Sequence, residues 1–136
     1  MPIANRDIAE KLRGAGLRPT RQRLALAEIL FNAGDRHVSA EALHAEALAA
    51  GVPVSLATVY NTLNQFTGAG LLREVAIEST RSYFDTNTSN HFHYFLEDKG
   101  QLVDIGAEQV EVTGLPAPPE GTEIDRIDVI VRLRRA

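Results

Sequence analysis

The spacing of apolar residues changes near residue 70, and this change constrains the fold more than any other feature of the chain. Up to that point apolar residues recur every three or four positions, as on one face of a helix. Beyond it, short runs such as "LLREVAI" and "HFHYFLED" have the pattern of strands. The sequence therefore predicts an α+β protein with a helical first half and a mostly β second half.

Four helices are expected over residues 1–70, each with a start or stop signal. The first covers about 5–14 and stops at the glycines that follow it. Thr20, Ser39 and Ser55 stand where the N-caps of the second, third and fourth helices belong, because their side-chain oxygens can accept a bond from the first turn.

Residues 71–84 read as a two-stranded hairpin with a short polar turn. Helices followed by such a ribbon are the elements of an N-terminal winged helix-turn-helix DNA-binding domain, expected over residues 1–84. A polar hinge is expected at 85–90. A small, mostly β dimerisation domain is expected over 91–136, with strands at "HFHYFLED", "GQLVDI", "EQVEV" and "RIDVIVRLRR" and a loop at the proline-rich "GLPAPPEG". Apolar strands in so small a unit favour pairing with a second copy.

Composition narrows the chemistry. The chain has 136 residues, four histidines and no cysteine, which excludes disulfides, thiolate zinc sites and cysteine nucleophiles. No apolar run reaches membrane-spanning length and no signal-peptide core is present, which fits a cytoplasmic protein with no membrane partner. Any metal or cofactor must be held by His, Asp, Glu or Tyr.

Charge is distributed unevenly. Residues 1–25 carry six Lys/Arg against two acids, whereas residues 76–136 carry six against eleven. A cationic end on a protein of net charge −4 suits local contact with a polyanion such as nucleic acid. The alternative is chance clustering on a solvated helix.

The fourth helix has an unusual polar face. At 100° per residue, one side carries Leu56, Val59, Leu63 and Phe66. The opposite side, with Tyr60 on its flank, carries Ala57, Thr58, Asn61, Asn64 and Gln65. An uncharged face of amides and hydroxyls suits base edges, whereas a helix that only needs solubility would carry Glu and Lys. The alternative is an ordinary amphipathic core helix.

Arginines near this helix can position it on DNA. Arg18, Arg21 and Arg23 stand at the start of the second helix, and Arg81 at the tip of the hairpin, where each could contact phosphate or simply be solvated. The residues expected to contact DNA are Arg18, Arg21, Arg23, Ser55, Ala57, Thr58, Tyr60, Asn61 and Arg81.

Two histidines form the other notable pattern. In a strand over residues 91–96, His91 and His93 share one face and can bind a single ion at about 2.0–2.1 Å each. A His-x-His pair alone is more often two half-buried strand residues, so a metal site needs further ligands nearby.

Several segments together resemble the Fur family of metal-sensing repressors: "GLRPTRQRLALAEIL", "HVSAEAL", "VPVSLATVYNTLNQFTGAGLLREV" and "HFH". The segments "PVSLATVYNTLNQFT", "YFDTNTSNHFHYF" and "DVIVRLRR" resemble its Irr branch, the iron response regulators. The resemblance covers nearly the whole chain. It implies a winged-helix domain joined to a small α/β dimerisation domain, a homodimer on palindromic double-stranded operators, and a fourth helix that reads bases.

The resemblance also implies a regulatory site. His37 and Asp85 match family ligands and would join His91 and His93 in holding Fe(II), Mn(II) or Zn(II). The alternatives are a surface-loop histidine and a strand-end carboxylate. Haem would take His91 and His93 as axial ligands, while His44 is expected to be structural.

Departures from the family pattern matter as well. The CxxC pairs of structural zinc are missing, as is the Cys-Pro haem motif of some Irr proteins. Phe92 and Ile127 replace ligands of a second metal site, and Asp104 and Glu111 are expected to lack imidazole partners. Because the segment after Asp104 is short and proline-rich, the sequence leaves open whether the long helix usual there is kept.

The resemblance implies a homodimeric transcriptional regulator of iron- and haem-responsive genes, which binds operators under iron limitation and is released by haem, with a haem-delivering protein as a further partner. The alternative is a metal-activated Fur-type repressor that responds to Mn(II) or Fe(II). Two other classes of function are open. A small His/Asp metalloenzyme would lack a nucleophile and a base beside the metal ligands, and a pure interaction module is the remaining alternative.

Overall fold

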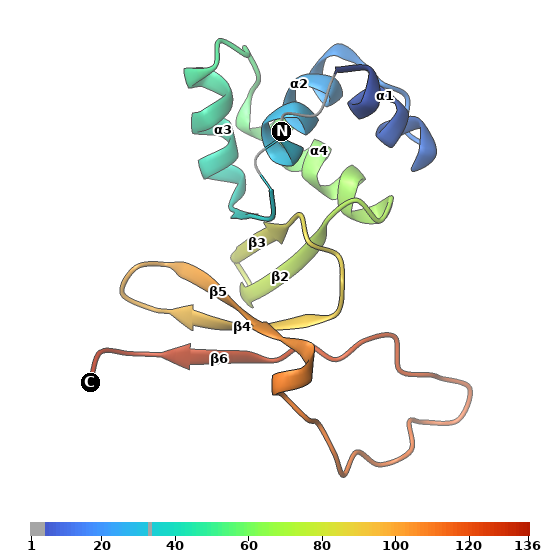
Figure 1. The fold of residues 1–136 in the computed structure, drawn as a ribbon, viewed down its shortest axis with the longest axis vertical. Coiled ribbons are helices and arrows are strands. Elements are labelled where there is room, and N and C mark those ends of the chain that lie inside the picture. Colours follow the sequence, from blue (N-terminus) through green and yellow to red (C-terminus); the bar gives the residue numbers. More distant parts are fainter. Residues whose placement is uncertain (1–4, 33) are drawn as a thin grey trace. The chain divides into compact units, whose positions relative to one another are not determined.

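The computed structural model describes residues 5–32 and 34–136, and the chain divides after Thr88 into two compact units. The first unit holds the α-helices and one three-stranded sheet, and the second holds another three-stranded sheet and a short 3-10 helix (Figure 1). The boundary falls within the segment 85–90, and Asp85 is the last residue of a strand in the first unit. The α+β class expected from the change in periodicity is confirmed.

The helices of the first unit begin where the sequence signals stand. They are α1 (Asn5–Gly14), α2 (Arg21–Phe31), α3 (Ala40–Ala49) and α4 (Leu56–Gly68). Thr20, Ser39 and Ser55 are the N-caps of α2, α3 and α4, and each side-chain oxygen accepts the backbone N–H three residues on. Each bond satisfies a donor that the helix itself leaves unpaired, which is why the helices start there.

The end of α4 is equally well defined. Gly70 N–H donates to Thr67 O at 3.0 Å, and Gly70 adopts a φ of +82°, which a residue with a Cβ rarely does. Leu71 N–H then donates to Phe66 O at 2.9 Å, closing the helix in a Schellman motif. The chain is thereby directed from α4 into the hairpin.

The apolar side of α4 anchors it in the core. Val59, Leu63 and Phe66 are fully buried, and the Phe66 ring lies 6.2 Å from that of Phe31 in α2. Leu56, expected on the same buried face, is instead exposed to 36%. It is the first residue of the helix, one turn ahead of the point where α4 meets the core.

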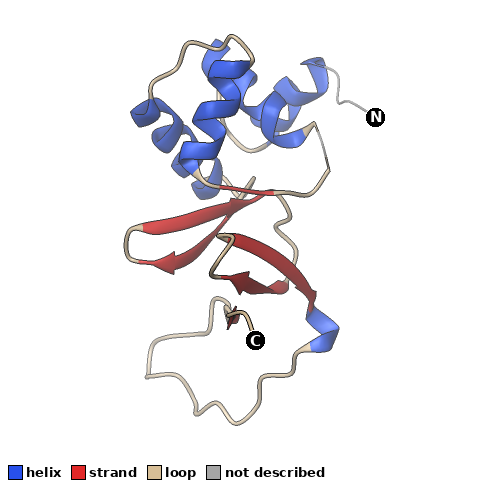
Figure 2. Cartoon of the chain, turned by 90° about the vertical axis from the view of Figure 1, so that its left-hand side faces the viewer, coloured by secondary structure: helices blue, strands red, loops and turns tan. Residues whose placement is uncertain are grey.

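The sheet of the first unit has the order β1-β3-β2 and all its pairs are antiparallel. The predicted hairpin is present as β2 (Arg73–Glu78) and β3 (Arg81–Asp85), visible as the upper pair of red arrows in Figure 2. The sequence did not predict β1 (His37–Val38), which adds to the free edge of β3. Two residues are too few to show a strand period.

The sheet of the second unit has the order β5-β4-β6. The strands β4 (His91–Leu96) and β5 (Gln101–Gly106) form an antiparallel hairpin, and β6 (Ile130–Leu133) pairs parallel to β4. The sequence predicted both hairpin strands, while the strand expected over 126–135 shrinks to four residues.

The chain between β5 and β6 differs from expectation. The strand predicted at "EQVEV" is wrong, because these residues form the end of a short 3-10 helix, η1 (Ala107–Gln109), and then run unpaired. The loop expected at 114–121 is confirmed. Within the described residues no long helix follows Asp104, and no helix is long and apolar enough to cross a membrane.

The cap of α3 gives a direct test of this fold. Ser39→Ala should lower the free energy of unfolding by about 1 kcal/mol, because the Ala42 N–H loses its acceptor. Ser39→Asp, which keeps an acceptor, should stay close to wild type. Urea unfolding followed by circular dichroism, at one protein concentration, measures both. Overlapping curves for Ser39→Ala and wild type would show that the cap contributes nothing.

Candidate nucleic-acid interface and metal-ligating residues

The polar side of α4 faces solvent as the sequence predicted. Five residues along it are exposed: Ala57, Tyr60, Asn61, Asn64 and Gln65. Thr58 is half-buried, and Ser55 is committed to the cap, since its hydroxyl accepts the Thr58 N–H and donates to the Thr58 hydroxyl at 3.0 Å. The helix therefore presents amide groups and one aromatic ring, with no charge on the face itself.

The start of α2 meets this face on one side. The guanidinium of Arg23 donates from Nε and Nη2 to Gln65 Oε1 at 3.2 and 3.1 Å, and from Nη1 to Arg18 O at 3.0 Å. Arg18 and Arg23 line an open hollow of about 490 Å³ together with residues of α4, including Asn61. Arg21 is exposed but does not line this hollow. Cationic and amide groups thus converge where phosphate and base edges could be contacted together.

The hairpin of β2 and β3 meets α4 on the other side, across an open groove of about 690 Å³. Tyr60 and Arg81 both line it. Arg81, expected to contact phosphate, is paired in the free protein with Glu78 at 2.9 Å. Tyr60 donates its hydroxyl to Glu41 Oε1 at 2.6 Å.

The bond between Tyr60 and Glu41 also shifts the pKa values of both groups. It is the largest cause lowering the pKa of Glu41 and the largest cause raising the pKa of Tyr60. Sequence reasoning missed Glu41, because the two residues lie 19 positions apart and only the docking of α3 beside α4 joins them.

The first unit holds one pair of candidate metal ligands. The pairing of β1 with β3 sets His37 opposite Asp85, and His37 Nε2 lies 3.3 Å from Asp85 Oδ2. Asp85 is fully buried, and its Oδ1 also accepts the Asn87 N–H at 2.9 Å. A buried carboxylate needs such partners, so this pair has a fixed place in the fold.

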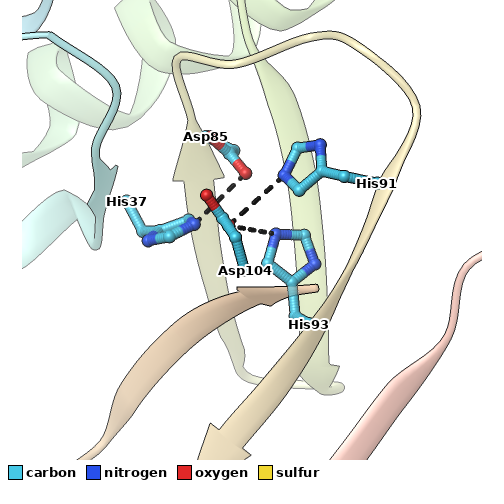
Figure 3. Close-up of side chains that lie close together, drawn as sticks. All are labelled: His37, Asp85, His91, His93 and Asp104. Carbon is cyan, nitrogen blue, oxygen red and sulfur yellow. Dashed lines mark ion pairs between the residues drawn. The ribbon is translucent and has the colours of Figure 1, made fainter. Parts of the chain in front are cut away.

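The second unit holds a group of three. His91 and His93 share one face of β4, and the antiparallel register sets Asp104 of β5 opposite His93. The Nε2 atoms of both histidines lie 3.5 Å from Asp104 Oδ1, and the two rings are 4.6 Å apart. Figure 3 shows these side chains with those of His37 and Asp85, and dashed lines mark the ion pairs.

Asp104 corrects an expectation. The sequence indicated that it would lack imidazole partners, and this was wrong. The reason is register: residues 93 and 104 pair because the hairpin turns at 97–100. Counting inward from that polar turn would have placed Asp104 beside His93.

The tautomer of His91 can be deduced from its contacts. Its Nδ1 lies 2.7 Å from Ser89 O, a carbonyl that can only accept, so Nδ1 carries a hydrogen. In the neutral ring Nε2 then has a lone pair, and Nε2 lies 3.5 Å from a carboxylate oxygen of Asp104. Two acceptors facing each other favour a cation between them, and imidazole with carboxylate suits first-row divalent ions.

His44 has a different role. Its Nε2 lies 3.0 Å from Val54 O, which joins α3 to the segment before α4. The interpretation of His44 as structural agrees with this contact.

Comparison with known sequences gives a consistent result. The sequence model of the Ferric uptake regulator family matches residues 14–131. The ferric uptake regulation protein of Yersinia pestis is 37% identical over 106 residues, which cover 77% of this chain and 72% of that protein. The protein of the same name from Escherichia coli K12 is 36% identical over 101 residues, covering 74% and 68%.

Solved structures agree with the sequences. The ferric uptake regulator of Pseudomonas aeruginosa, solved with manganese, has a TM-score of 0.70 and 29% identity and covers 93% of this chain and 96% of its own. The Vibrio cholerae regulator has a TM-score of 0.73 and 25% identity, covering 93% and 98%. The chain belongs to the ferric uptake regulator family, whose members are metal-responsive, DNA-binding transcription regulators and not enzymes.

Proposed function

We propose that this protein is a homodimeric, metal-activated repressor of iron-responsive genes in the cytoplasm. It reads palindromic double-stranded operators with α4, and a divalent ion held by His37, Asp85, His91 and His93 controls its affinity for DNA. The observation that carries this proposal is that the Nε2 atoms of His91 and His93, on one strand, both lie 3.5 Å from Asp104 Oδ1. A cation completes this arrangement.

The ligand count favours an ion shared by the two units. The first unit offers two donors, His37 and Asp85, and the second offers three, from His91, His93 and Asp104. Each added protein ligand replaces a water on the ion, so a site that uses donors of both units holds Mn(II), Fe(II) or Zn(II) more tightly than either group alone. We infer that one ion takes ligands from both units, with Asp104 as an added ligand.

A shared ion provides a means of control. When bound, it would link the two units and so restrict their relative orientation. In the Vibrio cholerae relative the DNA-binding domains undergo a structural rearrangement. Two α4 helices spaced for the two half-sites of a palindrome bind together, whereas wrongly spaced helices do not.

The DNA-contact surface is the exposed side of α4 with its two flanks. The uncharged amide face supplies base contacts, and the arginines beside it supply phosphate contacts and most of the affinity. The proposed contact residues are Arg18, Arg21, Arg23, Ser55, Ala57, Thr58, Tyr60, Asn61 and Arg81.

The second unit supplies a surface for dimerisation. Tyr94 of β4 lies between Val103 of β5 and Val131 of β6 in the strand register, and these side chains are exposed to 39, 41 and 38%. An apolar row across a whole sheet is a face that a second copy would cover. We assign the homodimer contact to this face.

Haem as the effector is the second candidate, and the resemblance to the Irr branch supports it. It would take His91 and His93 as axial ligands, be delivered by a partner protein and release the regulator from DNA. Both Nε2 atoms point at one carboxylate oxygen, and both rings are almost fully buried. The set of imidazole and carboxylate donors suits a single divalent ion.

The effector site can be tested through DNA binding. The double change His91→Ala and His93→Ala should leave a folded dimer whose binding to a selected duplex no longer tightens with Mn(II). His44→Gln removes an imidazole outside the site and should keep the Mn(II) response. Fluorescence anisotropy with no addition, with Mn(II) and with haem separates the candidates. A wild-type protein that ignores Mn(II) but is released by haem would contradict the metal proposal.

Base reading can be tested on a duplex selected by the wild-type protein from a randomised library. Tyr60→Ala and Thr58→Ala should each weaken specific binding by roughly 1–3 kcal/mol, with little change on unrelated DNA. Arg18→Ala should weaken both and flatten the salt dependence, because it removes a phosphate contact. If Tyr60→Ala binds the selected duplex like wild type, α4 does not read the sequence.

The dimer surface predicts two results by analytical ultracentrifugation. Tyr94→Glu should shift the protein toward monomer, because a carboxylate would be buried in the apolar row, while Tyr94→Phe should remain dimeric. A chelator should leave the wild-type dimer intact, because without cysteine no thiolate zinc holds the fold. Monomers on chelation would show that a metal is structural here.

A further inference from the structure

Tyr60 is held by a neighbouring helix before any DNA is present. It is the aromatic side chain on the exposed face of α4, and the residue is 39% exposed. Its hydroxyl donates to Glu41 Oε1 at 2.6 Å, and Glu41 lies in the first turn of α3. The bond therefore fixes the ring from outside the helix that carries it.

The length and type of this bond are favourable. A hydroxyl bonded to a carboxylate at 2.6 Å is a charge-assisted bond, stronger than one between neutral groups. The same bond lowers the pKa of Glu41, so the carboxylate is ionised at neutral pH. Ordering a side chain during binding weakens affinity by about two- to tenfold, and a ring that is already ordered avoids this loss.

Glu41 has a different kind of hydrogen-bond partner from the other acids that line the groove. Glu74 accepts a bond from Ser82 at 2.7 Å, and Glu78 is paired with Arg81 at 2.9 Å, so both are engaged within the hairpin. Glu41 is bonded instead to Tyr60 of α4. Its negative charge also lies beside a surface that must approach phosphates, which weakens binding to DNA of any sequence.

We propose that Glu41 is a positioning residue for base reading: it holds the Tyr60 ring in the orientation that DNA requires, and so raises sequence discrimination. This rests on the proposed function of α4. Glu41 touches no base itself. The charge of Glu41 weakens binding to all DNA equally. Its positioning of Tyr60 strengthens binding only to the recognised sequence.

Two substitutions at position 41 separate these effects. Glu41→Gln removes the charge but keeps an oxygen that can accept the Tyr60 hydroxyl. Glu41→Ala removes both. The quantity to measure is the ratio of the dissociation constants for unrelated DNA and for a duplex that the wild-type protein selects from a randomised library, with Mn(II) present. Glu28→Gln, an exposed acid of α2, controls for loss of one charge elsewhere.

Glu41→Gln should tighten binding to both duplexes and leave the ratio within about twofold of wild type, because the hydrogen bond from Tyr60 to residue 41 survives. Glu41→Ala should tighten binding to unrelated DNA equally but lower the ratio by roughly three- to tenfold. Tyr60→Phe, which keeps the ring and loses the hydroxyl, should lower the ratio similarly. The double variant of Glu41→Ala and Tyr60→Phe should lose no more than either alone. Unchanged melting curves would show that the helices remain docked.

Some contrary results would refute only the role of Glu41, and others would refute base reading by α4 as well. Equal ratios for Glu41→Ala and Glu41→Gln would show that Glu41 positions nothing, while leaving α4 as the reader. Additive losses in the double variant would show that the two residues act separately, and would also overturn the inference. If wild type enriches no sequence, or Tyr60→Ala keeps the wild-type ratio, base reading by α4 fails and this inference fails with it.

Discussion

The pairing of β1 with β3 is the contact on which the proposed control by a metal ion depends. It is only two residues long, yet it sets His37 against the fully buried carboxylate of Asp85. Arg36 extends it, since its N–H donates to the Thr86 hydroxyl at 2.9 Å and its carbonyl accepts the Thr86 N–H at 3.0 Å. A carboxylate that is buried must be paired, so the fold itself keeps these ligands together.

The same short strand is fastened to the DNA-binding helices. The guanidinium of Arg36 makes two bonds to Glu46 of α3, at 3.0 and 2.6 Å, and a third to Ile29 O of α2. The residue before His37 is thus bonded directly to α2 and α3. In the second unit alternate residues of β4 lie on opposite faces of the sheet, with His91 and His93 on one face and Tyr94 on the other.

Local signals in the sequence predicted the parts of this structure that local interactions decide. The N-caps at Thr20, Ser39 and Ser55 were predictable because the capping bond spans three residues. The partnership of Asp104 with the histidines was not, because it depends on the register of a hairpin. The bond from Glu41 to Tyr60 depends on how two helices pack, and no pattern within either helix indicates it. Likewise "EQVEV" alternates like a strand but finds no neighbour to pair with.

Binding of Mn(II) by single-ligand variants from each unit, measured by isothermal titration calorimetry, tests most directly whether one ion is shared. The suitable pair is His37→Gln, which can still bond the buried Asp85, and His93→Ala. A shared site predicts that wild type binds one tight Mn(II) per protomer and that both variants lose that tight binding. Wild-type affinity in His37→Gln together with its loss in His93→Ala would confine the site to the second unit and contradict a shared ion.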